Sequence, residues 1–255
     1  MTDVSPVSTR GAPKASSDDG IDAGKMDQIA SRRTSKPTLR NDFSPMTRVV
    51  TAQVQSEKLV TDRRDRIIRA AITVFHRQGF HSTTTADIAR EAGLTQSNLY
   101  NYVKSKQDVL FLVCEHLVGI YEQLLDEVAE QYEDPHTRIV EALRAVTRVM
   151  GEYRDEVQLL YNETHALEKS DRVVILSSIS RFIGRFEQLV EDYDAAGGRV
   201  VLDDKRLAAN FCSFIPAMTA LRYWDLVLHN SDRAQDSIVD FILRGLGIPE
   251  VSPRA

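Results

Sequence analysis

The stretch TTTADIAREAGLTQSNLYNYVKSK, residues 83–106, holds two short helix signals and a glycine between two much longer amphipathic runs. Thr84 has Asp87 three positions later, which is typical of a helix N-cap with an acidic partner. Gly93 can take the left-handed conformation that ends a helix, and Thr95 can then cap a second one. The stretch therefore predicts a short helix, a glycine turn and another short helix, which is the pattern of a helix-turn-helix.

Amphipathic helices are expected on both sides of this stretch. Before it, apolar residues from Ile67 to Phe75 recur at helical spacing until Gly79 ends the run. After it, helical runs are expected at 106–131, 137–152, 154–168, 171–196, 203–229 and 233–245. No strand alternation of useful length interrupts them in the sequence. The prediction is an all-α fold, with a small N-terminal three-helix head followed by a larger helical bundle.

The chain divides into four parts by composition. We expect a disordered tail at 1–56, the helix-turn-helix head at 57–108, the bundle at 109–247 and a short tail at 248–255. The first part is rich in small polar residues, Pro and Gly, and cannot bury enough apolar surface to offset the entropy of ordering. Its loose basic run could follow a phosphate backbone. An inert extension, with Met26 or Met46 as the true start, is an equal alternative.

Net charge differs between the head and the bundle. Residues 57–108 carry 9 basic and 6 acidic side chains, whereas residues 109–255 carry 15 basic and 25 acidic ones. The head is therefore suited to a polyanion such as nucleic acid, and the bundle would repel one. The alternative is that this small excess of basic side chains in the head is only an ordinary solvated surface.

Several classes of protein do not fit this sequence. No run approaches the roughly 18 uninterrupted apolar residues of a membrane-spanning helix, and the N-terminus lacks a secretory-signal pattern, so we expect a cytoplasmic protein without membrane contact. Cys114 and Cys212 lie far apart in apolar runs and are expected to be buried thiols. The motifs of nucleotide-binding enzymes, hydrolases and metalloproteases are missing, so we expect neither enzyme activity nor a cofactor.

The polar side chains of the opening stretch suit double-stranded DNA. Amides pair with adenine edges and hydroxyls with bases or phosphates, so Gln96, Ser97 and Asn98 are candidates for base contacts. The polar side chains expected to face solvent or a ligand are Thr95, Gln96, Ser97, Asn98, Tyr100, Asn101 and Tyr102. The residues better suited to phosphate are Thr84, Thr95, Tyr100, Tyr102 and Lys106. The alternative is a helical adaptor that binds only protein and carries these residues as a polar surface.

The run FHRQGFHSTTTADIAREAGLTQSNLYNYVKSKQDVL, residues 75–110, closely resembles the N-terminal domain of the TetR family of one-component bacterial repressors. The matching positions are Gly79-Phe80, Thr83-Thr84, Asp87-Ile88-Ala89, Ala92-Gly93, Leu99-Tyr100, Tyr102 and Lys106. The resemblance implies a homodimer whose two heads enter successive major grooves of an operator. It also implies that the bundle holds the dimer and a pocket for a small-molecule effector that releases the repressor. Ser97 departs from the glycine common in the family, and Val103 from its Phe.

The last two predicted helices carry more large apolar residues than one small core requires. We therefore expect them to form an isologous dimer interface, matching a two-fold symmetric operator. The residues are Leu207, Phe211, Phe214, Ile215, Met218, Leu221, Trp224, Leu228, Ile238, Phe241 and Ile242. Alternatively they belong to the internal core, as we expect for about a third of them.

Polar residues that interrupt an apolar helical run are candidates for the effector pocket. They are Tyr161, Asn162, Glu163 and His165. A satisfied buried network is the alternative, and such residues form one more often. His165 and Glu168 could share a helix face, but a third ligand is not identifiable, so no metal site is expected.

Three segments are similar to the branch of the family that senses acyl-CoA thioesters in lipid and steroid catabolism. They are YNETHAL at 161–167, RFIGRFEQLVEDYDAAGG at 181–198 and LRYW at 221–224. This resemblance implies that Arg181, Arg185 or Arg222 meets the CoA phosphates. The acyl channel would be lined by Phe182, Phe186, Phe214 and Met218. The alternative is that these arginines are surface residues paired with Glu187, Glu191 or Asp225.

Overall fold

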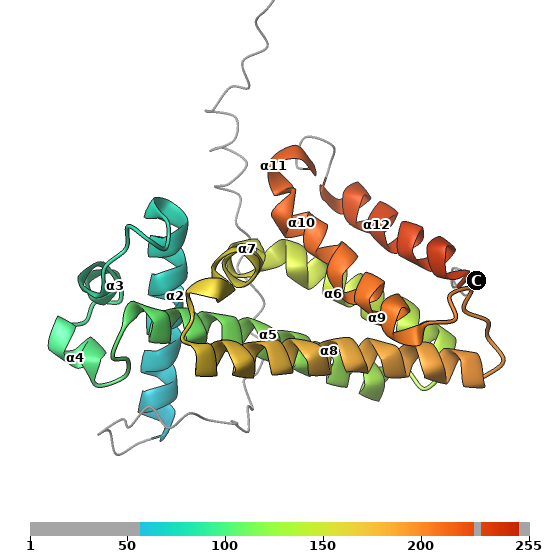
Figure 1. The fold of residues 1–255 in the computed structure, drawn as a ribbon, viewed down its shortest axis with the longest axis horizontal. Helices are drawn as coiled ribbons and strands as arrows, with labels where there is room; N and C mark the ends of the chain where they lie inside the picture. The colour runs from blue at the N-terminus through green and yellow to red at the C-terminus, as the bar shows by residue number, and fades with distance from the viewer. Residues whose placement is uncertain (1–56, 227–230, 250–255) are drawn as a thin grey trace, which may run out of the picture. The chain divides into compact units, whose positions relative to one another are not determined.

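The structure of this chain is a computed structural model that describes residues 57–226 and 231–249, with side chains described over 62–226 and 233–249 (Figure 1). Every regular element within these residues is a helix, so the all-α prediction is confirmed. None of the described helices is long and apolar enough to cross a bilayer. The tail predicted at 1–56, Leu228 and most of the tail predicted at 248–255 lie outside the described residues.

Three helices form the head: α2 (Glu57–Gln78), α3 (Thr85–Glu91) and α4 (Gln96–Tyr100). α2 packs against α3, and α3 packs against α4. The buried core of the head includes Ile67, Ala71, Phe75, Phe80, Ile88, Ala89 and Leu99. Because α3 and α4 are too short to be stable alone, this core and the helix caps must hold them in place.

The remaining elements form the bundle. They are α5 (Lys106–Gln131), α6 (Pro135–Glu152), α7 (Arg154–Glu163), η1 (Thr164–Ala166), α8 (Lys169–Ala195), α9 (Lys205–Phe214), η2 (Ile215–Ala217), α10 (Met218–Leu221), α11 (Tyr223–Leu226) and α12 (Ser231–Leu246). α5 packs against α2 of the head and against α6, α7 and α8, and most of its residues from Val109 to Val128 are buried. The head is therefore attached directly to the central helix of the bundle.

Two of the predicted helices are interrupted. The single helix predicted at 203–229 is wrong, because α9 ends at Phe214 and Pro216 lies in η2. Proline has no backbone N–H and its ring clashes with the preceding turn, so it breaks a helix interior. The helix predicted at 154–168 ends at Glu163 and tightens into the 3-10 turn η1, as helix C-termini often do.

An aromatic cluster lies between α5 and α8. The ring of Tyr121 stacks on that of Phe182 with centroids 5.0 Å apart, and Phe182 meets Phe186 edge-on at 5.5 Å. All three residues are buried. Cys114 and Cys212 are buried too, as predicted, and burial raises the pKa of each thiol to about 12. Both thiols therefore stay protonated and act as small apolar core groups.

Candidate nucleic-acid interface

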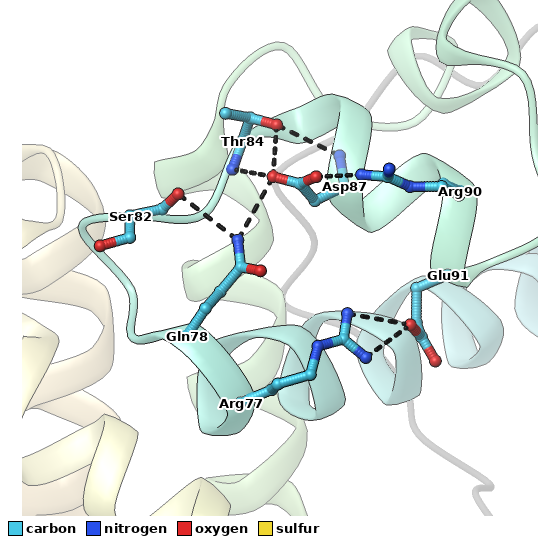
Figure 2. Close-up of polar contacts among 7 residues, drawn as sticks. All are labelled: Arg77, Gln78, Ser82, Thr84, Asp87, Arg90 and Glu91. Atoms are coloured by element: carbon cyan, nitrogen blue, oxygen red, sulfur yellow. Dashed lines mark hydrogen bonds and ion pairs between the residues drawn. The ribbon is translucent and has the colours of Figure 1, made fainter.

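α3 begins with the capping box that the sequence predicts (Figure 2). Asp87 Oδ2 accepts hydrogen bonds from the backbone N–H of Thr84 at 3.0 Å and from the Thr84 hydroxyl at 2.7 Å. In return, Thr84 Oγ1 accepts a hydrogen bond from the backbone N–H of Asp87 at 3.2 Å. The bonds from Thr84 lower the pKa of Asp87, with smaller contributions from Gln78 and Arg90. Thr84 is therefore confirmed as the N-cap.

Side chains of α2 hold α3 from outside the core. The guanidinium of Arg77 donates to Glu91 Oε2 at 3.2 and 3.3 Å, and Gln78 Nε2 donates to the capping carboxylate at 3.3 Å (Figure 2). Arg66 Nη2 donates to the carbonyl oxygen of Ala92 at 2.6 Å. Polar contacts therefore hold both ends of α3 against α2.

The turn into α4 also agrees with the sequence prediction. Gly93 has φ +63°, and the N–H of Leu94 donates to the carbonyl oxygen of Ala89 at 2.8 Å, as in a helix that ends on a left-handed glycine. Thr95 then caps α4 by accepting a hydrogen bond from the N–H of Asn98 at 3.2 Å. The caps therefore satisfy free backbone N–H groups at the start of both short helices.

One exposed polar surface, which we name the α4 edge, runs along α4. It consists of Thr95, Gln96, Ser97, Asn98 and Tyr100. Tyr100 is 47% exposed, and its hydroxyl lies 3.1 Å from Thr85 Oγ1 and accepts a hydrogen bond from Gln96 Nε2 at 3.5 Å. These two bonds, led by that with Thr85, lower the pKa of Tyr100. The edge therefore presents two amides, two aliphatic hydroxyls and a phenol to solvent.

Two residues predicted to contact phosphate already have partners inside the head. The prediction that Tyr102 faces solvent or a ligand is wrong, because Tyr102 is only 4% exposed and its hydroxyl accepts a hydrogen bond from Arg63 Nη1 at 3.4 Å. The hydroxyl proton of Thr84 is directed at Asp87. Phosphate contacts by either residue stay predictions.

Lys106 joins the head to α5. Its Nζ donates to the carbonyl oxygens of Phe80 at 2.6 Å and His81 at 2.9 Å, and lies 4.6 Å from the centroid of the Phe80 ring. An ammonium group has three donors, so one is left for a phosphate oxygen. That contact stays a prediction, whereas the structure shows the contact with the α2–α3 turn.

Comparison with known proteins identifies the family. Residues 67–113 match the model described as bacterial regulatory proteins of the tetR family. The HTH-type transcriptional regulator HbdR of Aromatoleum sp. (strain CIB) is 32% identical over 197 residues, covering 77% of this chain and 83% of the relative. The chain belongs to the TetR family. It is therefore a helix-turn-helix transcriptional regulator and not an enzyme.

Two further TetR-family comparisons bear on the bundle. The HTH-type transcriptional repressor KstR2 of Mycolicibacterium smegmatis is 31% identical over 105 residues, covering 38% of this chain and 51% of that protein. The structure of ketosteroid transcriptional regulator KstR2 of Mycobacterium tuberculosis matches with a TM-score of 0.60 and 17% identity, over 79% of this chain and 100% of that chain. At that identity, the structural match shows the fold alone.

Some side chains predicted to bind an effector of this TetR-family protein are buried and others lie at the surface. The eight main candidates are Tyr161, Glu163, His165, Phe182, Phe186, Phe214, Met218 and Arg222. Phe182 and Phe186 are buried in the aromatic cluster. The exposed members are Tyr161, His165, Phe214, Met218 and Arg222. The rings of Tyr161 and Phe214 contact each other at 5.7 Å. Glu163 and His165 lie beside His81 of the head, a residue that sequence analysis missed because no local spacing links it to α7.

Arg181 and Arg185 lie at the surface in ion pairs, as the alternative to CoA binding predicted. Their partners are not the predicted Glu187, Glu191 or Asp225. Arg181 pairs with Glu122 at 3.4 Å, and Arg185 pairs with Asp126 at 2.7 Å. Both pairs link α8 to α5. Pairs as exposed as these contribute little to stability, so the guanidinium groups stay accessible to another anion.

A cavity of about 450 Å³ lies between α5, α6 and α12. Its lining includes the charged residues Glu127, Glu141, Arg144, Arg148 and Asp236. None of the eight predicted effector-binding residues lines it. Because acidic and basic groups are mixed there, the cavity favours neither an anionic nor an apolar ligand.

A second exposed surface, which we name the apolar face, lies on α9 to α12. Its residues are Leu207, Phe211, Phe214, Met218, Trp224 and Phe241. Of the other residues predicted for the dimer interface, Ile238 and Ile242 are buried, and Ile215 and Leu221 are half-buried. The dimer interface predicted for this region therefore stays a prediction, with six of its residues exposed.

Asp87→Asn removes the carboxylate of the capping box, so we expect a lower melting temperature at pH 7. The pKa of Asp87 is lowered in the folded chain, so its contribution is complete above the unfolded pKa of about 3.9 and is lost as pH falls through the lowered value. The difference in melting temperature from wild type should be constant between about pH 7 and pH 5 and shrink below about pH 4. Circular dichroism melts measure it.

The control for this series is Asp203→Asn, which changes an exposed carboxylate outside the head. It should melt close to wild type at every pH in the range. A difference between wild type and Asp87→Asn that did not shrink at low pH would contradict the role of the carboxylate as a cap.

Proposed function

We propose that this protein is a homodimeric, cytoplasmic repressor that binds a double-stranded DNA operator through the α4 edge and leaves it when a small-molecule effector binds. The observation that carries the proposal is the α4 edge, whose exposed donors and acceptors lie on a helix held by caps and a buried core. In a helix-turn-helix, these positions of the second helix reach base edges in the major groove. The name of one relative, a transcriptional repressor, supports repression as the sign of regulation.

Within the α4 edge, side-chain chemistry divides the contacts. Gln96 and Asn98 carry amides that pair bidentately with adenine, and Ser97 between them can bond to a base or a phosphate. Thr95 and Tyr100 flank them and suit the phosphate backbone. Lys106 contributes its remaining donor to phosphate. Thr84 and Tyr102 stay as secondary candidates, since each must change its present hydrogen bonds first.

Substitutions in the head should separate base reading from phosphate binding. We expect Gln96→Ala and Asn98→Ala each to reduce discrimination between operator and altered operator by about 5- to 150-fold, the value of one bidentate pair. Lys106→Ala should weaken binding to every duplex and reduce the slope of log K against log salt by about one. Fluorescence anisotropy with matched duplexes at several salt concentrations measures both effects.

Gln131→Ala, an exposed glutamine at the end of α5, is the control and should bind DNA like wild type. The same titrations test the adaptor alternative. A protein that binds only other proteins would show no salt-dependent affinity for any duplex. Lys106→Ala binding as tightly as wild type at the same salt would contradict the assigned role of that lysine.

The apolar face supports a homodimer. Its six residues come from consecutive elements at the end of the bundle, and they include three phenylalanines and one tryptophan. Aromatic side chains of this kind dominate the energetics of protein interfaces. Two copies of the face meeting about a two-fold axis would pair two heads, as a symmetric operator requires.

Charge placed on the apolar face should dissociate the dimer. We expect Phe214→Asp and Phe241→Asp each to weaken self-association by about 30-fold or more, because truncating a central aromatic anchor costs about 2 kcal/mol or more. Sedimentation velocity over a concentration series measures this. Ala129→Asp places the same charge on an exposed position of α5 and should leave the dimer intact. Unchanged self-association in both Phe variants would locate the interface elsewhere.

An acyl-CoA is the effector that we propose. The buried hydroxyl of Tyr121 has no hydrogen-bond partner among the described residues, and it lies against the ring of Phe182. Burial, with Tyr161 and Glu156 nearby, raises the pKa of Tyr121, so the phenol stays a donor. A ligand that joins an apolar chain to a carbonyl oxygen satisfies both the aromatic rings and this donor.

Acyl-CoA thioesters should stabilise the protein and release DNA. We expect Tyr121→Phe to bind the effector about 2- to 10-fold more weakly, the value of one neutral hydrogen bond. The unliganded variant should be as stable as wild type or more stable, because a partnerless buried hydroxyl is removed. Thermal-shift assays with a panel of acyl-CoAs measure both, and Tyr132→Phe is the matched control. Failure of every acyl-CoA to stabilise wild type would exclude this effector class.

A further inference from the structure

Three side chains from separate elements meet where the head contacts the end of α7. His81 lies in the turn between α2 and α3, Glu163 is the last residue of α7, and His165 lies in η1. One atom from each, an imidazole nitrogen or a carboxylate oxygen, lies within 4.8 Å of the other two. His81 Nε2 is 3.5 Å from Glu163 Oε2. The proposed DNA contacts do not use this cluster, and neither does the proposed effector contact at Tyr121 and Phe182, although Glu163 and His165 were effector candidates from the sequence.

The carboxylate of Glu163 is incompletely satisfied. Its Oε2 atom is buried and accepts no hydrogen bond from any described residue. The contact with His81 is an ion pair only when that imidazole is protonated. A buried carboxylate oxygen without a donor or a cation is unfavourable. A metal ion would satisfy this oxygen and could take one imidazole nitrogen from each histidine as a further ligand.

We infer that His81, Glu163 and His165 bind one divalent cation of the zinc class, and that this ion links the head to the bundle. Two imidazole nitrogens and one carboxylate oxygen suit zinc and its neighbours in the transition series. Calcium and magnesium prefer sites made of oxygen alone. Three protein ligands leave a fourth tetrahedral position for a water molecule.

Small side-chain movements close this site. Bonds of about 2.0–2.1 Å to zinc place the ligand atoms of a tetrahedral site roughly 3.3 Å apart, so the present separations have to shrink by no more than about 1.5 Å. The side chain of His81 is 75% exposed and His165 is also exposed, so both imidazoles are free to rotate. The backbone that carries His81 is held by Lys106, which donates to its carbonyl oxygen at 2.9 Å.

Zinc titration of the full chain in the absence of DNA tests this inference. By isothermal titration we expect one Zn²⁺ per chain, and binding at least about tenfold weaker in His81→Ala, His165→Ala and Glu163→Gln. His76→Ala is the matched control, because His76 is a half-exposed histidine of the same head that pairs with Asp155 at 3.3 Å, outside the cluster. This control should bind Zn²⁺ like wild type.

A thermal shift gives a second measurement on the same proteins. At a free Zn²⁺ concentration of about 100 times Kd, the melting temperature of wild type should rise by about 5–10 °C, and that of His81→Ala should not. Both histidines are exposed, so their alanine variants should fold, which circular dichroism checks. Absence of Zn²⁺ binding in wild type would overturn the site. Unchanged affinity in His81→Ala would overturn the link between head and bundle.

Discussion

The ammonium of Lys106 is the contact on which the position of the DNA-binding head depends. It stands at the first residue of α5 and donates to two carbonyl oxygens of the α2–α3 turn. The capping box of α3 starts only a few residues after that turn, and α4 is fixed in turn by its packing on α3. A short series of direct contacts therefore sets the position of the α4 edge relative to α5, the central helix of the bundle.

This arrangement gives an effector a physical route to DNA. Tyr121, the buried donor assigned to the effector, lies on α5, the same helix whose first residue holds the head. A ligand that binds better to a shifted position of α5 would move both heads of a dimer, and the change in operator affinity is limited by that difference in ligand affinity. A zinc-class ion at His81 would act on the same turn and would link it to α7 and η1, which carry the other two ligands.

The helix-turn-helix and the bundle are stabilised in different ways. α3 and α4 are shorter than an isolated helix can be in water, so their caps and the polar contacts from α2 matter as much as their few buried residues. The longest helices of the bundle, α5, α6 and α8, pack on one another and bury apolar side chains between them. Substitutions at caps should therefore affect DNA binding through the head, whereas core substitutions should affect the whole chain.

Sequence by itself determined the features that depend on neighbours along the chain. The capping box of Thr84, the left-handed Gly93, the Thr95 cap and the bounds of α5 follow from spacing within one or two turns, because caps and helix periodicity are local. The break at Pro216 could also have been predicted, because proline disrupts a helix interior, but the long apolar pattern around it favoured one continuous helix.

Only the tertiary structure decided which side chains meet across elements. The sequence pattern predicted that Tyr102 faces solvent or a ligand. In the structure its side chain is buried, and its hydroxyl accepts a hydrogen bond from Arg63 of α2. Lys106 donates to backbone carbonyl oxygens of a turn that is distant in the sequence. His81 lies beside Glu163 and His165, although no sequence pattern connects these three residues. Contacts of this kind depend on the angles at which helices cross, and those angles are set by the packed core as a whole rather than by any local run of residues.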